Sequence, residues 1–121
     1  MIALSEKKRL ICCVTGTRAD YPRVKTVLKE IVSRPTLTLK LLVTGAHLSP
    51  RFGNTISEIE KDGFEIAARI PIYDDDDTPY GMAKAAARCS DGIADALHAL
   101  NPDLVLLTVD RIETLAAAQS A

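Results

Sequence analysis

The sequence predicts an α/β fold built on a parallel β-sheet, and two features of its pattern lead to this prediction. Short apolar runs alternate along the chain with segments whose apolar residues recur three or four positions apart. The apolar runs lack a regular polar alternation, which is typical of strands buried on both faces of a sheet. Strands that alternate with helices form parallel sheets with helices on both faces, joined by right-handed crossovers.

The first half of the chain is predicted to form two strands and two helices. Residues 9–15 are apolar and end at Thr-Gly-Thr, as expected of a buried strand. A helix over 20–33 follows, because proline is tolerated in a first turn and the apolar positions then have helical spacing. The second strand covers 37–44. After a polar loop, Thr55 is expected to cap a short helix that ends at Asp62-Gly63.

The second half repeats the alternation of strands and helices. A strand is predicted over 64–70, and a helix with one buried apolar stripe runs from Thr78-Pro79 to residue 100. Asn101-Pro102 ends this helix, and residues 104–107 provide a fourth buried strand. A last helix is expected over 110–118. The resulting order is βαβαβαβα within a single domain over residues 1–121.

Composition excludes several classes of protein. The formal net charge of -1 offers no basic excess for phosphates along a duplex, so nucleic acid is not expected as a partner. The apolar run over 10–14 is too short for a signal peptide or a membrane span, which predicts a cytoplasmic protein without membrane contact. The three cysteines have no zinc-like spacing, and we interpret them as buried thiols.

Ligands of open parallel sheets bind beyond the carboxyl ends of the strands, near the point where strand order reverses. After the first strand, Gly16 allows close backbone approach, free amides start a helix, and Arg18 can clamp phosphate oxygens. This segment is neither a dinucleotide-binding fingerprint nor a Walker loop. The alternative is an ordinary turn, with Asp20 as the N-cap and Arg18 in a surface ion pair.

Two further segments fall on the same edge. Asp110 and Arg111 follow the fourth strand and can offer a carboxylate for proton transfer beside a cation for phosphate. Alternatively, Asp110 and Glu113 have the spacing of a capping box and only start the helix. His47, in the loop after the second strand, is a candidate substrate-binding residue. The acidic run over 74–77 lacks the spacing of a calcium loop and is predicted to be a solvated loop.

Several motifs occur in order along the chain. They are Val-Thr-Gly-Thr-Arg-Ala-Asp-Tyr (14–21), Val-Thr-Gly-Ala-His-Leu-Ser (43–49), Phe-Gly-Asn-Thr (52–55), Ile-Glu-Lys-Asp-Gly-Phe (59–64), Pro-Asp-Leu-Val (102–105) and Asp-Arg (110–111). With them the chain resembles the hydrolysing UDP-N-acetylglucosamine 2-epimerases over nearly its whole length. Non-hydrolysing relatives typically carry Gly-Thr-Arg-Pro-Glu and Thr-Gly-Gln-His, so Ala19-Asp20 and Ala46-His47 favour the hydrolysing branch.

The resemblance implies a reaction and roles for particular residues. UDP leaves UDP-N-acetylglucosamine (UDP-GlcNAc) to give 2-acetamidoglucal, and water then adds to give N-acetylmannosamine, a precursor of sialic-acid-type sugars. Arg18 and Arg111 are implied to bind UDP, while Asp110 is implied to transfer a proton and Asp20 to help shape the catalytic site. No metal or redox cofactor is implied.

The resemblance also implies a GT-B-like architecture, in which two Rossmann-like domains hold the nucleotide sugar between them. On that basis we expect this chain to be an incomplete N-terminal domain without activity of its own. Where the family usually has Gly-Asp-Arg, the chain has Val109, whose β-branched side chain disfavours positive φ and narrows the space for a ligand. The site is therefore expected to be altered.

Two other classes of function remain open at this point. One is a fragment of a non-hydrolysing epimerase, and the other is a non-catalytic α/β binding module. An uncovered sheet edge and exposed apolar helix faces also lead us to expect a homo-oligomer.

Overall fold

The computed structural model describes residues 7–108 and 111–121 of the chain. Its strands are β1 (Arg9–Thr15), β2 (Leu37–Thr44), β3 (Ile66–Ile70) and β4 (Leu104–Leu106), and its α-helices are α1 (Tyr21–Ser33), α2 (Ile56–Lys61), α3 (Pro79–Leu100) and α4 (Ile112–Ser120). Two 3₁₀ turns, η2 (Gly45–Leu48) and η3 (Pro50–Phe52), lie between β2 and α2. The predicted alternation of strands and helices is confirmed.

The four strands form one sheet in the order β3-β2-β1-β4, and every pair is parallel. Strand β1 lies in the centre, where Arg9 pairs with Leu37 of β2 and Ile11 pairs with Leu104 of β4. Because the chain moves outward from β1 to β3 and then returns to the other side of β1, strand order reverses between β1 and β4. The segments that follow these two strands therefore meet at the position where such sheets bind ligands.

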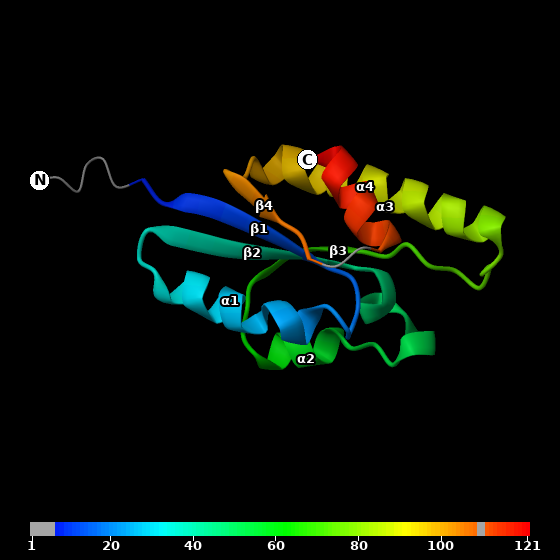
Figure 1. Cartoon of the computed structure of the whole chain (residues 1–121), viewed down its shortest axis with the longest axis horizontal. Helices are drawn as coiled ribbons and strands as arrows, with labels where there is room; N and C mark the ends of the chain where they lie inside the picture. Colours follow the sequence, from blue (N-terminus) through cyan, green and yellow to red (C-terminus); the bar gives the residue numbers. More distant parts are fainter. Residues whose placement is uncertain (1–6, 109–110) are drawn as a thin grey trace, which may run out of the picture.

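Helices cover both faces of the sheet, as the sequence predicted for a Rossmann-like fold (Figure 1). Neighbouring residues of β1 point to opposite faces: Cys12 packs with α3 and α4, whereas Cys13 packs with α1 and α2. Cys89, on α3, completes a set of thiols that are all buried and free. Burial raises the pKa of Cys89 to about 11 and that of Cys13 to about 12, so both thiols remain protonated and apolar at neutral pH.

Element boundaries differ from the sequence predictions where tertiary contacts intervene. Strand β3 begins at Ile66 instead of Phe64, and the Phe64 ring packs edge-on against Tyr21 of α1 at a centroid distance of 6.5 Å. Helix α4 begins at Ile112, with Arg111 in extended backbone as its N-cap. The predicted polar loop after β2 contains η2 and η3. In the described part of the chain, no helix is both long and apolar enough to cross a membrane.

We predict that Leu28→Ala in α1 lowers the free energy of unfolding by about 2–5 kcal/mol, because this side chain is fully buried against the sheet and its removal leaves a cavity. Its neighbour Val27 is 48% exposed and provides a matched control, since Val27→Ala should change stability by about 0.5 kcal/mol or less. Urea unfolding followed by circular dichroism measures both variants. Equal losses for the two would contradict the packing of α1 described above.

Candidate functional site

A cavity of about 450 Å³ lies at the carboxyl edge of the sheet. Its lining comes from the segments that follow three of the strands, with contributions from α3 and the N-cap of α4: Thr17, Arg18, Ala19, Ala46, Arg51, Phe52, Thr55, Tyr73, Asp74, Asp76, Asp77, Met82 and Arg111. The predicted convergence of distant segments at this edge is therefore present. Arg18 and Arg111, which are separated by most of the chain, both line this one cavity.

A third guanidinium, which the sequence analysis did not single out, also lines the cavity. Arg51 lies on η3 and pairs with Asp77 at 3.2 Å, so it spans from the segment after β2 to the loop before α3. Phe52 beside it packs against Tyr73 with a centroid distance of 6.2 Å. In the sequence, the only sign of a role for Arg51 was its position in the loop after β2. With Arg18 and Arg111, it gives the cavity three guanidinium groups, which lie beside the carboxylates of Asp74, Asp76 and Asp77 in the same lining.

The Asp20 side chain holds the loop after β1 in place and does not bond to α1. Its carboxylate accepts hydrogen bonds from the backbone amides of Gly16 and Thr17, each at 3.0 Å, and from the Thr15 hydroxyl. Asp20 occupies the N-cap position of α1, as the alternative predicted, but its side chain makes no capping hydrogen bond to the helix. The sequence had suggested free amides for a phosphate in this segment, but the amides of Gly16 and Thr17 are bound to Asp20. Asp20 is 4% exposed, and its catalytic role stays a prediction.

His47 lies behind the cavity and is 1% exposed. Its Nε2 is 2.8 Å from the Thr15 hydroxyl, and its Nδ1 is 2.7 Å from the Thr55 hydroxyl. Because Thr15 donates its only hydroxyl proton to Asp20, it must accept from Nε2–H, and Thr55 then donates to Nδ1. Thr55 occupies the predicted N-cap position of α2, but its hydroxyl bonds to His47 and makes no capping hydrogen bond to the helix. The contacts of His47 connect two loops, and direct substrate binding by this residue stays a prediction.

Glu113 is the functional candidate that the sequence analysis underestimated. Its carboxylate is 3% exposed, accepts from the Tyr73 hydroxyl at 3.2 Å, and pairs with Nε of Arg111 at 3.3 Å. With Arg111 as the N-cap, Glu113 is the second helical residue, so the capping-box spacing from Asp110 does not hold. The only sequence signal was an acidic residue in a first helical turn. The long-range contact with Tyr73 is a product of the fold.

Two glycines make room for the Glu113 carboxylate. A Cβ added at Gly16 would lie 2.9 Å from Oε2 of Glu113, and one added at Gly45 would lie 2.8 Å from the same atom. Gly45 also has φ +62 and would place its Cβ 2.6 Å from the Gly16 carbonyl oxygen, which accepts a hydrogen bond from Ala46 N at 2.7 Å. The loops after β1 and β2 therefore touch each other and the carboxylate, which any larger residue would prevent.

Burial and charge act on the remaining groups of this cluster. Burial raises the pKa of Tyr73, and the nearby negative charge of Glu113 raises it further. Burial alone would lower the pKa of Arg111, but Glu113 and Tyr73 outweigh this effect and raise it. Arg111 is consequently a permanent cation at the cavity wall. Asp110, predicted to transfer a proton, and Val109 lie outside the described residues, and the expectations for both stay predictions.

The acidic loop over 74–77 is exposed, as predicted. Its carboxylates form local turns and ion pairs: Asp76 accepts from the amide of Thr78 at 2.9 Å, and Asp74 pairs with Arg88 at 3.5 Å. Within residues 7–108 and 111–121, no group of three or more His, Cys, Asp or Glu side chains is arranged to hold a metal ion.

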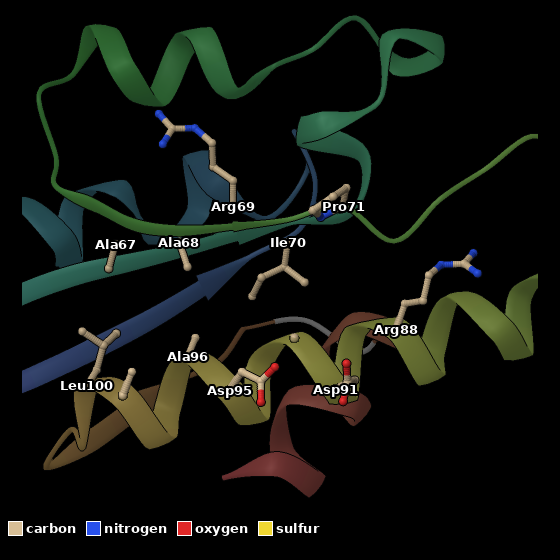
Figure 2. A pocket seen from close by; sticks show the side chains of 12 residues that line it. Ala67, Ala68, Arg69, Ile70, Pro71, Arg88, Asp91, Asp95, Ala96 and Leu100 are labelled. Atoms are coloured by element: carbon tan, nitrogen blue, oxygen red, sulfur yellow. The ribbon is translucent and has the colours of Figure 1, made fainter.

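A second hollow, of about 590 Å³, lies between β3 and α3 (Figure 2). Figure 2 shows Ile70 and Ala68 of β3 facing Ala96 and Leu100 of α3, with Arg88 and the acidic side chains of α3 along the rim. This groove lies at the sheet edge, away from the carboxyl ends of β1 and β4 where strand order reverses. We therefore take the cavity that contains the arginines as the candidate site.

A parallel α/β sheet with a polar cavity at its switch point, lined by three arginines and three aspartates, defines the class of open α/β proteins that bind ligands at this edge. The chain belongs to the UDP-N-acetylglucosamine 2-epimerase family, whose sequence model matches residues 29–121. The family resemblance inferred from the motifs is thereby confirmed.

Some curated relatives carry the word hydrolyzing in their names, and others are named without it. The chain is 42% identical over 113 residues to a UDP-N,N'-diacetylbacillosamine 2-epimerase (hydrolyzing) of Legionella pneumophila, covering 93% of this chain and 30% of the relative. It is 40% identical over 111 residues to a GDP/UDP-N,N'-diacetylbacillosamine 2-epimerase (hydrolyzing) of Campylobacter jejuni, covering 92% and 29%. A UDP-N-acetylglucosamine 2-epimerase of Neisseria meningitidis is 31% identical over 108 residues, covering 89% and 28%. The chain thus spans less than a third of the length of these relatives.

Solved structures show the same fold. A UDP-N-acetylglucosamine 2-epimerase superposes with a TM-score of 0.77 at 18% identity, over 94% of this chain and 29% of that one. The Neisseria meningitidis enzyme in complex with UDP-GlcNAc gives a TM-score of 0.74 at 22% identity, over 92% and 28%. At these identities the superpositions establish the arrangement of the elements.

We predict that the stability of the chain falls as the pH is lowered through about 6.5, in part because of His47. Burial lowers the pKa of His47 in the folded chain, although Asp20 and Glu58 act in the opposite direction. Below the ordinary pKa of 6.5 the unfolded chain therefore binds a proton that the folded chain does not, and the free energy of unfolding falls by up to about 1.4 kcal/mol per pH unit.

Urea unfolding between pH 5 and 8 measures this effect by comparing variants. His47→Gln should remove part of the slope between about pH 5 and 6.5, whereas His98→Gln, at an exposed position of α3, should leave it unchanged. An identical slope for wild type and His47→Gln would show that His47 does not contribute.

Proposed function

We propose that this chain is the N-terminal part of a hydrolysing 2-epimerase that acts on a UDP-linked 2-acetamido sugar. The observation that supports this proposal is that Arg18 and Arg111 line one cavity at the point where strand order reverses. This substrate class includes UDP-GlcNAc and UDP-N,N'-diacetylbacillosamine, after which the relatives are named. In the whole enzyme the ligand is a nucleotide sugar whose diphosphate faces the arginines.

The proposed reaction has two steps. A base removes the proton on C2 of the sugar while the bond from C1 to the phosphate oxygen breaks, so that a C1=C2 double bond forms and the bonding electron pair leaves with UDP. Water then adds its hydroxyl to C1 and a proton returns to the opposite face of C2, which gives the free epimerised sugar. Asp110 is our proposed base, and Arg18 and Arg111 stabilise the charge that develops on the departing diphosphate.

The hydrolysing reaction is favoured over the non-hydrolysing one by two observations. The relatives that share 40% and 42% identity with this chain both carry the word hydrolyzing in their names. The chain also has Ala19-Asp20 and Ala46-His47 where non-hydrolysing enzymes typically have Pro-Glu and Gln-His. We further propose that residues 1–121 alone do not turn over substrate, since the relatives are more than three times as long. Homo-oligomerisation stays a prediction.

We predict that the 121-residue chain binds UDP saturably at low ionic strength and that Arg18→Ala or Arg111→Ala each weakens binding by about tenfold or more, because a charge-assisted contact with the diphosphate is lost. Arg23→Ala is the matched control, since Arg23 is exposed on α1 and does not line the cavity. Isothermal titration calorimetry measures all four proteins. The absence of binding at millimolar UDP would contradict the proposed site.

Activity is testable by fusing residues 1–121 to the part of the Legionella pneumophila relative that this chain does not cover. We predict that the fusion releases UDP and a free epimerised sugar from UDP-N,N'-diacetylbacillosamine or UDP-GlcNAc, measured by chromatography and NMR. Asp110→Asn should reduce turnover by at least about 100-fold if it removes the base, whereas Asp95→Asn, on the exposed side of α3, should not. A product that retains UDP would instead identify a non-hydrolysing enzyme, and an inactive but folded fusion would favour the binding module.

A further inference from the structure

Glu113 lies where the segments after three strands come together. Gly16 follows β1, Gly45 follows β2 and Tyr73 follows β3, and the Glu113 carboxylate contacts Tyr73 and occupies the space that a side chain on either glycine would take. Arg111, on the segment after β4, pairs with the same carboxylate. The buried Glu113 side chain thus lies against a residue from the segment after each of the four strands.

The carboxylate is poorly compensated for a buried charge. A carboxylate can accept about four hydrogen bonds, but the described donors to the Glu113 side chain are only the Tyr73 hydroxyl at 3.2 Å and Arg111 Nε at 3.3 Å, both longer than usual for their type. The Arg111 side chain is itself 44% exposed. A buried ion pair of this quality contributes little net stability, so stability alone does not account for a carboxylate at this place.

The geometry of the ion pair leaves Arg111 available to a ligand. Glu113 engages Nε of the guanidinium, whereas a bidentate contact with a phosphate can use the terminal nitrogens Nη1 and Nη2. Arg111 and Tyr73 both line the cavity, and Glu113 does not. The carboxylate therefore lies behind two cavity-lining side chains and limits their rotation.

We propose that Glu113 is a positioning residue of the nucleotide site: it holds Arg111 and Tyr73 in place at the cavity wall and sets the spacing of the Gly16 and Gly45 loops. This inference rests on the proposed function, because its ligand is the diphosphate of UDP. It adds to that function a residue that touches no substrate but orders the groups that do. Arg111 then meets the ligand with less loss of side-chain entropy than a free surface arginine.

The contact with Gly16 is testable without any ligand. Gly16→Ala should raise the equilibrium constant for unfolding by about tenfold or more, because the new methyl group overlaps Glu113. In the Glu113→Ala background the same substitution should have a much smaller effect, since the three atoms nearest to the added Cβ all belong to Glu113. Gly45→Ala is the control and should not be rescued, because it also meets the Gly16 carbonyl oxygen at positive φ. Equal effects of Gly16→Ala in the two backgrounds would overturn the inferred contact.

The positioning role is tested by a double-mutant cycle on UDP affinity, measured by calorimetry. Glu113→Gln keeps the shape of the side chain but removes its charge, and it should weaken UDP binding by about tenfold. In the Arg111→Ala background, Glu113→Gln should have almost no further effect, because the arginine that it positions is absent. A purely structural role predicts the same loss in both backgrounds, and that result would overturn the proposal.

A substitute variant and the UDP affinity of the wild-type chain keep the test decisive. If Glu113→Gln does not fold, Tyr73→Phe replaces it, since this variant removes one of the two hydrogen bonds to the carboxylate and keeps the ring. Tyr73→Phe should weaken UDP binding by about threefold, and unchanged affinity would overturn the proposal. If the wild-type chain and Glu113→Gln bind UDP equally well, only the positioning role is overturned. A wild-type chain that binds no UDP overturns the proposed function together with this inference.

Discussion

Parallel pairing of β1 with both of its neighbours is the constraint on which the rest of the structure depends. It buries β1 on both faces, which requires an apolar strand and a helix layer on each side. It also brings the carboxyl ends of all strands to one edge, so that residues as distant as Arg18 and Arg111 line the same cavity. The reversal of strand order beside β1 leaves room for a ligand between the segments that follow β1 and β4.

Among the described residues, the buried polar side chains lie at or next to this edge. Thr15, Asp20 and His47 form one hydrogen-bonded chain that ends at Thr55, and Glu113 forms a second cluster with Tyr73 and Arg111. Such groups are costly to desolvate and specify a loop geometry when their bonds are satisfied. These bonds join the segments that follow different strands and so define the positions of these segments at the edge.

The sequence predicted the order of elements well, because the apolar periods of strands and helices are local properties of the chain. It also placed Arg18 and Arg111 together, since the parallel sheet follows from the alternation of elements. It placed Asp20 and Thr55 at N-cap positions but did not predict that their side chains bond elsewhere, because each has a tertiary or loop partner that competes with the helix amide. Glu113 was treated only as a possible cap, because its contact with Tyr73 joins residues 40 positions apart.

By itself, the sequence determined the fold class, the family and the edge of the sheet at which the candidate cavity lies, because each of these follows from patterns of local spacing and ordered motifs. Only the tertiary structure decided which polar groups are buried and what they contact. His47 connects two loops from behind the cavity, and Glu113 fits against Gly16 and Gly45. Such contacts depend on the approach of separate loops to within van der Waals distance, and no local pattern in the chain encodes that distance.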